Sequence, residues 1–422
     1  MRTVSAVVTC GTARLGTSER FAVDVAWWAD VGPVVTGLAE RLGVAVTVLR
    51  LLTVTGGEGA RDGHVTYHVE AAEPPARGLS PADGAFPDLL APQPLRSPWA
   101  TAGGVRELLG WAERRLAAAG RAPTGPAEQH RTWNLAGLFR LPTATGPVWL
   151  KATPHFAADE AAALAAIARH DRTLVPDVVA GGPGRVLLEH VPGGHGHDAP
   201  DDVIANVLGR FATVQAALAP PDRATAHAPR DDGLSGGRDV GSQVRALLDD
   251  GLPDRRDVAA QVRTLLDDGV PELTPDERAA ARRLTGRWRE LAACGLPDTL
   301  VHGDFHPVNW HGDPPVVIDL ADAHVGNPVL DGLRAADFLP DAARPSAAHA
   351  WVRAWAELVP GSDPARALAV AEPLAHLAYA VRYQEFLDGI EPSERVYHDG
   401  DPAAAVREAL RLAAAPSPWA VA

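Results

Sequence analysis

Residues 300–333 read LVHGDFHPVNWHGDPPVVIDLADAHVGNPVLDGL, and this stretch is the most informative part of the sequence. Asp304 follows an apolar run in a polar turn, and Asn309 comes five positions later. The apolar run 316–318 is a strand candidate, and Asp319 stands at its end. An Asp and an Asn five residues apart on one loop can face one cavity, and an Asp at the end of a neighbouring strand can join them. The sequence therefore predicts three oxygen-bearing side chains around one site.

This combination suits phosphoryl transfer. That reaction needs a carboxylate to orient the attacking hydroxyl and accept its proton, and oxygen ligands to hold Mg²⁺ on the phosphates. Asp304 fits the first role, whereas Asn309 and Asp319 fit the second. The alternative for Asp304 and Asn309 is a polar turn that caps a helix, and the arrival of Asp319 at the right place argues against it. His302 is expected to brace the loop rather than transfer a proton, and His306 fits either role.

The segment 302–309, HGDFHPVN, resembles the HGDxxxxN loop of the aminoglycoside phosphotransferase and choline kinase family. Residues 317–320 resemble its metal-binding strand, and 326–331 resemble its GxPxxDL segment. The resemblance implies an α+β, bilobal protein-kinase-like fold, with a β-rich N-lobe and a helical C-lobe, preceded here by a small N-terminal α/β domain. It implies ATP and Mg²⁺ as cofactors, with Asp304 as the catalytic residue and Asn309 and Asp319 as metal ligands.

Lys151 is the single lysine among 39 basic residues. A compact ammonium contacts phosphate differently from a planar guanidinium, so this position needs a reason; a solvated strand lysine is the alternative. The resemblance implies that Lys151 meets the nucleotide phosphates and is held by Glu160, with Asp159 as the other candidate partner. It also implies that the backbone of Glu189 and Val191 contacts adenine.

The sequence departs from the family in two places. The usual glycine-rich loop is poor in glycine here, because residues 133–139 hold only one. We expect the backbone of 134–137 to contact the nucleotide phosphates instead. Asp-Leu-Ala stands at 319–321, and no Ala-Pro-Glu follows. The second departure favours a small-molecule kinase over a protein kinase.

Composition excludes several classes of protein. A net charge of −14 argues against a nucleic-acid partner. No apolar run is long enough to span a membrane. Cys10 and Cys294 are too few for a disulfide framework, and free thiols suit a reducing cytoplasm. The first residues are too polar for a signal peptide. We therefore expect a cytoplasmic protein without a membrane partner.

Three parts are expected along the chain: an α/β domain with a Pro-rich linker over 1–104, a nucleotide-binding N-lobe over 105–192, and a helical C-lobe over 193–422. An internal repeat, RDVGSQVRALLDDGLPDR then RDVAAQVRTLLDDGVP, starts at residue 238 and predicts a duplicated helix. Thr274, Pro275 and Glu277 together predict a helix start.

The predicted function is ATP-dependent phosphoryl transfer to a hydroxyl of a small molecule, with antibiotics such as aminoglycosides as the commonest association of the resemblance. Four acidic residues could receive a cationic substrate or form solvated helix faces: Glu385, Asp388, Glu391 and Glu394. The alternative function is a catalytically silent kinase-like protein that binds nucleotide or partners, and the intact Asp304, Asn309 and Asp319 count against it. The N-terminal part shapes the substrate site, forms a homodimer or binds a partner protein, and the sequence does not choose among these.

Overall fold

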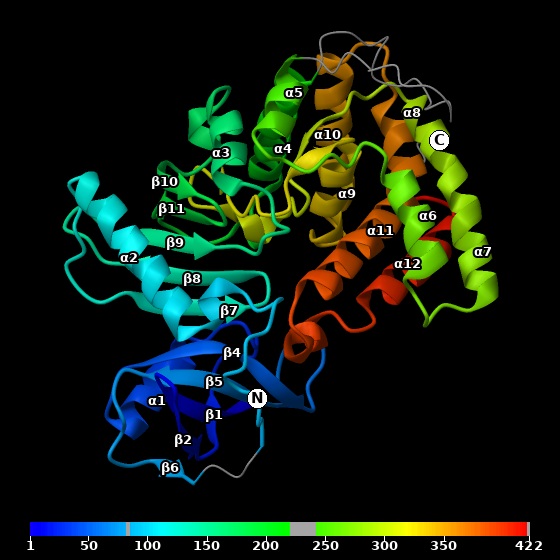
Figure 1. Ribbon diagram of the computed structural model, residues 1–422. Coiled ribbons are helices and arrows are strands. Elements are labelled where there is room, and N and C mark those ends of the chain that lie inside the picture. The colour runs from blue at the N-terminus through cyan, green and yellow to red at the C-terminus, as the bar shows by residue number, and fades with distance from the viewer. Residues whose placement is uncertain (82–84, 220–241, 420–422) are drawn as a thin grey trace. The chain divides into compact units, whose positions relative to one another are not determined.

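The computed structural model describes residues 1–81, 85–219 and 242–419, and the chain divides into two compact units (Figure 1). Unit 1 comprises Met1–Phe156, Val179–His190 and Phe386–Asp399. Unit 2 comprises Ala157–Val178, Val191–Glu385 and Gly400–Ala422. The polar insertion 220–237 and the first residues of the repeat, 238–241, lie outside the described residues.

Unit 1 begins with a six-stranded sheet in the order β4-β5-β1-β2-β6, with β3 also paired to β1. Its centre is the parallel pair β1 (Arg2–Cys10) and β5 (His64–Ala71), and β-branched residues such as Val4, Val65 and Val69 are fully buried there. Helix α1 (Gly32–Leu42) packs its apolar stripe, Val34, Leu38 and Leu42, into the same core.

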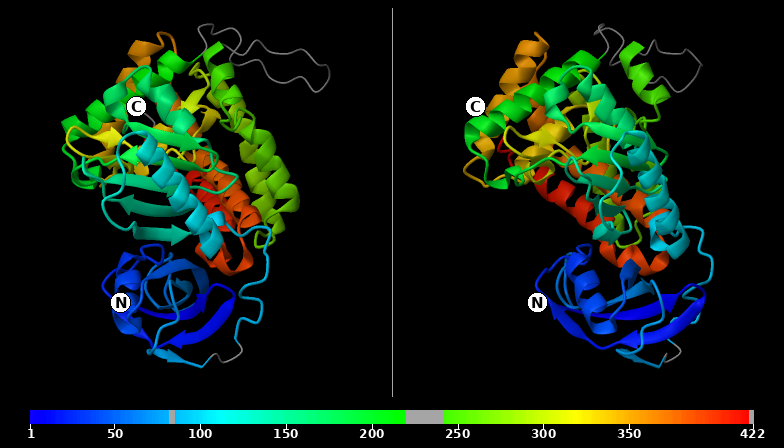
Figure 2. Two further views of the ribbon diagram at one scale, coloured as in Figure 1. Left: turned by 60° about the vertical axis from the view of Figure 1, so that its left-hand side comes forward. Right: turned by 90° about the vertical axis from the view of Figure 1, so that its left-hand side faces the viewer.

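The second sheet of unit 1 has five strands in the order β10-β11-β9-β8-β7, and β9 pairs antiparallel with both β8 and β11. Helix α2 (Ala102–Ala118) lies along this sheet (Figure 2) and buries Trp111 and Leu116 against Phe139 and Leu150. The other elements of unit 1 are β2 (Ala13–Ser18), β3 (Phe21–Val23), β4 (Val46–Thr55), β6 (Leu79–Ser80), the 3₁₀ turn η1 (Pro98–Ala100), β7 (Glu128–Trp133), β8 (Ala136–Leu141), β9 (Val148–Ala152), β10 (Val178–Gly182), β11 (Arg185–Glu189) and η6 (Pro392–Tyr397).

Unit 2 is mainly helical. Helix α10 (Arg344–Leu358) packs on α4 (Asp201–Leu218) and α9 (Val329–Asp337), and two short antiparallel pairs, β12 with β15 and β13 with β14, frame one loop. The other elements are α3 (Glu160–Ala168), η2 (Arg172–Leu174), η3 (Gly196–Asp198), α5 (Ser242–Asp249), α6 (Val258–Asp268), α7 (Pro275–Leu284), η4 (Thr285–Arg287), α8 (Trp288–Ala292), β12 (Thr299–Val301), η5 (Pro307–Asn309), β13 (Trp310–His311), β14 (Val316–Val317), β15 (His324–Gly326), α11 (Pro364–Gly389) and α12 (Asp401–Ala413).

The expected α+β class is confirmed. The predicted helix start is also confirmed, because the Thr274 side chain accepts from the backbone of Glu277 and the Glu277 side chain accepts from the backbone of Thr274. No helix among the described residues is long and apolar enough to cross a membrane.

Two local features differ from what the sequence favours. The residues 133–141 are rich in apolar side chains and predict one strand, but they include the turn of the β7-β8 hairpin at Asn134 and Leu135. The expected linker 73–104 contains β6, paired with β2, and the buried Trp99, whose indole N–H donates to the Trp133 carbonyl. The expected domain boundaries at 104 and 192 stay a prediction.

Candidate active site

The loop that follows β12 is fixed by its own histidine. The ring of His302 is fully buried, its Nδ1 accepts from the Asp304 backbone N–H at 3.2 Å, and its Nε2 donates to the Ile318 carbonyl at 3.0 Å. Burial lowers the pKa of His302, so the ring stays neutral. Since both ring nitrogens are bonded to the backbone, the expected bracing role is confirmed.

A buried carboxylate anchors the start of the loop from α9. Asp331 is 1% exposed and accepts from the backbone N–H of His302 at 2.8 Å, from that of Gly303 at 3.1 Å, and from the Gln215 side chain at 2.8 Å. Gly303 has φ +86°, and a Cβ there would lie 2.3 Å from the Asp322 carbonyl oxygen. Only glycine fits this turn, so the Gly-Asp pair of the motif has a steric basis.

The carboxylate of Asp304 receives four N–H donors. Arg334 on α9 donates to Oδ1 through Nε at 2.9 Å and Nη2 at 2.7 Å. His306 and Asn309 each reach Oδ2 at 3.1 Å. Burial alone would raise the pKa of this carboxyl, but the hydrogen bond from His306 and the charge of Arg334 outweigh it and hold the pKa well below its usual range. Asp304 is therefore ionised throughout the neutral range.

Two backbone bonds bring Asp319 to the loop. The Ile318 N–H donates to the Asn309 carbonyl at 3.0 Å, and the Ile318 carbonyl receives the His302 bond described above. Asp319 comes next and adopts φ +65°, a left-handed conformation that is rare for residues other than glycine. Such strain clusters at functional sites, because the surrounding structure must maintain it.

The oxygen-bearing side chains of Asn309 and Asp319 fit a magnesium ion. The Asn309 amide nitrogen donates to Asp304, to the carbonyl at 2.9 Å and to Oδ2, so the amide nitrogen and oxygen are assigned and the oxygen faces another direction. A carboxylate and an amide oxygen, completed by substrate phosphates and water, are the usual ligands of Mg²⁺ in kinases.

A comparison with known protein families agrees with this chemistry. Residues 138–368, more than half of the chain, match the model of the phosphotransferase enzyme family. The chain belongs to the phosphotransferase enzyme family. The loop, its anchor Asp331 and Asp319 all lie within the matched residues. No curated protein sequence matches the chain.

Several solved structures resemble this phosphotransferase at a distance. One of a putative fructosamine-3-kinase from Thermobifida fusca is 22% identical, with a TM-score of 0.46, and the match covers 71% of this chain and 97% of that one. One of the macrolide 2'-phosphotransferase MphH from Brachybacterium faecium is 19% identical, with a TM-score of 0.44, and covers 69% and 98%. One of a choline/ethanolamine kinase family protein from Mesorhizobium loti is 17% identical, with a TM-score of 0.44, and covers 72% and 98%.

The two residues expected to hold nucleotide phosphates lie in different units of the phosphotransferase. Lys151 is on β9 of unit 1 and is 8% exposed. Glu160 opens α3 in unit 2, is 4% exposed, and accepts from the Leu320 N–H at 3.0 Å, directly after Asp319. Asp159, the other candidate, is the N-cap of α3 and accepts from the Ala162 N–H at 3.1 Å. The pairing of Lys151 with Glu160 stays a prediction.

The expected adenine and phosphate contacts fall at strand ends. Glu189 is the last residue of β11, and its side chain forms an ion pair with Arg121. Val191 opens the long segment of unit 2, and its side chain lies against Gly312. In the β7-β8 turn, the Asn134 side chain is fully buried, and neither its oxygen nor its nitrogen has a hydrogen-bond partner within the described residues. An orphaned buried amide of this kind suits a polar ligand.

The four acidic residues suggested for a cationic substrate are mostly engaged elsewhere. Glu385 accepts from Arg255 and from Arg382, each at 2.9 Å. Glu391 pairs with two arginines of unit 1. Glu394 is 3% exposed, and burial raises its pKa to about 8. These pairings and this burial favour structural roles for the three carboxylates, and their contact with a cationic substrate stays a prediction.

Sequence reasoning missed Arg334, which makes the shortest contact to Asp304. Its guanidinium also stacks on Phe338 at 4.5 Å and Tyr379 at 5.0 Å. The available signal was spacing, since Arg334 lies three residues after Asp331 and therefore on the same side of a helix.

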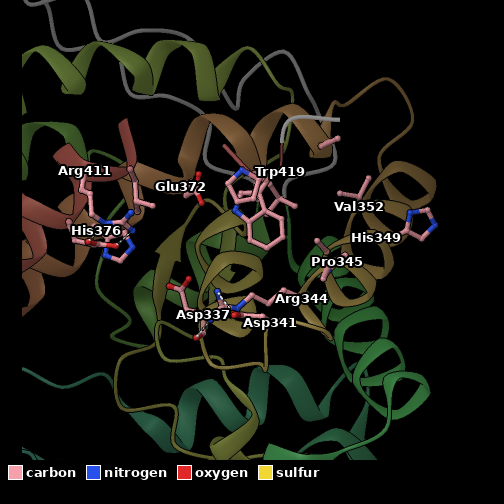
Figure 3. A pocket seen from close by; sticks show the side chains of 16 residues that line it. Asp337, Asp341, Arg344, Pro345, His349, Val352, Glu372, His376, Arg411 and Trp419 are labelled. Atoms are coloured by element: carbon pink, nitrogen blue, oxygen red, sulfur yellow. Dashed lines mark hydrogen bonds and ion pairs between the residues drawn. The ribbon is translucent and has the colours of Figure 1, made fainter. Parts of the chain in front are cut away.

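Unit 2 also contains a cavity of about 860 Å³ (Figure 3). Helices α10, α11 and α12 contribute most of its wall, with Arg344, Glu372, His376 and Arg411 among the labelled side chains. None of its lining residues comes from the catalytic loop. We therefore do not assign it to the phosphotransfer chemistry.

Proposed function

We propose that this chain transfers the γ-phosphoryl group of ATP to a hydroxyl of a small molecule. The observation that carries the proposal is one connected site: the ionised Asp304 carboxylate, with Asn309 beside it and Asp319 joined to the same loop by the two backbone bonds of Ile318. Asp304 would orient the acceptor hydroxyl and take its proton. Asn309 and Asp319 would hold Mg²⁺, which, when bound with ATP, neutralises charge on the transferred group.

The low pKa of Asp304 is compatible with this role. Phosphoryl transfer passes through a loose transition state in which the attacking hydroxyl needs orientation more than early deprotonation. A carboxylate that is ionised at neutral pH can accept a hydrogen bond from that hydroxyl once one of its present donors moves away. The residue is therefore a positioning base, and its weak basicity is no obstacle.

The nucleotide would be held by residues of the five-stranded sheet, by Val191 and by the start of α3. Lys151 would contact the phosphates, with Glu160 as its carboxylate partner. Glu160 also accepts from the backbone after Asp319, which supports a link between nucleotide and metal positions. The orphaned amide of Asn134 lies in the turn from which phosphate cover was expected, and the backbone of Glu189 and Val191 would meet adenine.

The charges near Asp304 favour a neutral or anionic acceptor over a polycationic aminoglycoside. The guanidinium of Arg334 lies 2.7 Å from the carboxylate that would meet the acceptor hydroxyl, and an ammonium group there would face like charge. Aromatic rings of Phe338 and Tyr379 flank the guanidinium. A hydroxyl of a sugar alcohol or nucleoside is compatible with these neighbours.

One observation supports the second candidate, a silent nucleotide-binding protein. The four donors on Asp304 equal the roughly four lone-pair positions of a carboxylate, so an acceptor hydroxyl must displace one of them. Arg334 is the donor that comes from outside the loop. Transfer therefore requires Arg334 to release one of its two bonds.

The test is incubation with ATP, Mg²⁺ and a library of aminoglycosides, macrolides, nucleosides, sugars and amino alcohols, with mass spectrometry to detect product that gains one phosphate. Asp304→Asn should abolish transfer while nucleotide binding, measured by calorimetry, is retained. Full activity in Asp304→Asn would refute the assigned role. Nucleotide binding by the wild type without any product would favour the silent protein.

A further inference from the structure

A smaller polar cavity, of about 280 Å³, lies in the N-terminal part of unit 1. Its wall comes from β1, β4, β5 and the first turn of α2, together with residues 89–101 that precede the helix. All of these residues precede the family match at 138–368, so the phosphotransfer site does not account for the cavity.

A directed chain of hydrogen bonds forms one wall. Arg50 Nη1 donates to His68 Nδ1 at 2.8 Å, so the ring proton must be on Nε2, which donates to Thr9 Oγ1 at 2.9 Å. The Thr9 hydroxyl then donates to Glu70 at 2.7 Å. Arg50, His68 and Thr9 are at most 3% exposed. This wall is rigid, because each member is held by the next.

Positive charge exceeds negative charge around the cavity. Arg50, Arg96 and Arg106 line it. Glu391 pairs with Arg50 at 3.4 Å and with Arg96 at 3.1 Å, and Glu70 supplies the other carboxylate. Burial lowers the pKa of the His68 ring to about 3, so the ring adds no charge at neutral pH. Among the described residues, the three lining guanidinium groups are matched by Glu70 in the wall and by Glu391, which pairs with two of them, an excess of one positive charge.

The first turn of α2 adds to this field. Ala102 and Gly103 are the first two residues of this 17-residue helix, and both line the cavity. The Thr101 side chain caps the next N–H, that of Gly104, at 3.0 Å. The N–H groups at the first positions of a helix have no partner inside the helix and carry a partial positive charge.

We infer that this cavity is a binding site for a small anion, a carboxylate or phosphate group, held by Arg96, Arg106 and the first turn of α2 and supported by the fixed Arg50. An anion with one negative charge would balance the excess positive charge around the cavity. The volume restricts the ligand to a small metabolite. Arg106 is exposed on α2 and accessible to a ligand, whereas Arg50 is held by His68 and by the Leu89 and Ala100 carbonyls.

The test uses the full chain and isothermal titration calorimetry with inorganic phosphate and, separately, with acetate and citrate, at constant ionic strength in a chloride buffer. Arg106→Ala should weaken binding about ten-fold, the value of one charge-assisted hydrogen bond. Arg114→Ala is the matched control, because Arg114 is exposed on the same helix, two turns further on, and does not line the cavity.

A second variant should change the affinity in the opposite direction. Glu70→Gln removes a negative charge from the wall and keeps an oxygen that can accept from Thr9, so it should tighten binding several-fold. The phosphate and carboxylate titrations decide which anion the site prefers. Equal affinity in the wild type and Arg106→Ala, or no binding of any of the three anions, would overturn the inference. Neither result depends on phosphotransfer activity.

Discussion

The ion pair between Arg334 and Asp304 should stabilise the fold as well as fix the carboxylate proposed as catalytic. The two side chains are 20% and 28% exposed, so solvent screens the pair only in part. Arg334→Gln removes the charge and at least one of the two bonds to Oδ1, and hydrogen bonds between charged groups contribute about 1.5–3 kcal/mol. Asp304 keeps its bonds from His306 and Asn309. We expect the free energy of unfolding at pH 7 to fall by about 2–3 kcal/mol.

The stability difference between the wild type and Arg334→Gln should also depend on pH. The pKa of Asp304 is lower in the folded protein than the value of about 3.9 in an unfolded chain, so its stabilising contribution is complete above about pH 4 and is lost as the pH falls below that. The difference between the wild type and Arg334→Gln should therefore be constant from pH 7 to pH 5 and shrink towards pH 3.

Urea denaturation followed by circular dichroism at pH 7, 5, 4 and 3 measures both quantities. Arg353→Gln is the matched control, since Arg353 is exposed on α10, and its effect should stay within about 0.5 kcal/mol. A loss below about 0.5 kcal/mol in Arg334→Gln at pH 7, or a loss of the same size at every pH, would show that the ion pair does not stabilise Asp304 as argued.

Three further outcomes are expected. Gly303→Ala should lower the free energy of unfolding by about 2 kcal/mol or more and slow phosphotransfer, because the added Cβ would lie 2.3 Å from the Asp322 carbonyl oxygen at φ +86°. Urea denaturation measures the first effect and the mass of the product the second. A variant with wild-type stability would contradict the steric argument. Thr274→Ala should cost about 1 kcal/mol by removing the cap bond to the Glu277 N–H, with phosphotransfer unchanged; a loss of activity would show a role beyond the cap. Lys151→Arg should weaken ATP binding in calorimetry despite the retained charge, and unchanged affinity would argue against the phosphate contact.

The sequence predicted the loop 302–309 and the start of α7 well, because these depend on local information. The five-residue spacing of Asp304 and Asn309 and the capping box at Thr274 are both set by neighbours in the chain. The β7-β8 hairpin was missed because Asn134 and Leu135 carry no glycine or proline turn signal, and the buried position of Asn134 depends on tertiary packing.

The sequence by itself determined which residues can carry phosphotransfer chemistry: a carboxylate, an amide and a second carboxylate at fixed spacing, and one lysine upstream. Only the tertiary structure decided their environment. Arg334 reaches Asp304 across 30 residues, and Asp331 reaches His302 across 29. Glu391 lies 295 residues from its partner Arg96. Charge balance, pKa and cavities arise from such long-range contacts, and side chains that meet only after folding leave no pattern in a single sequence.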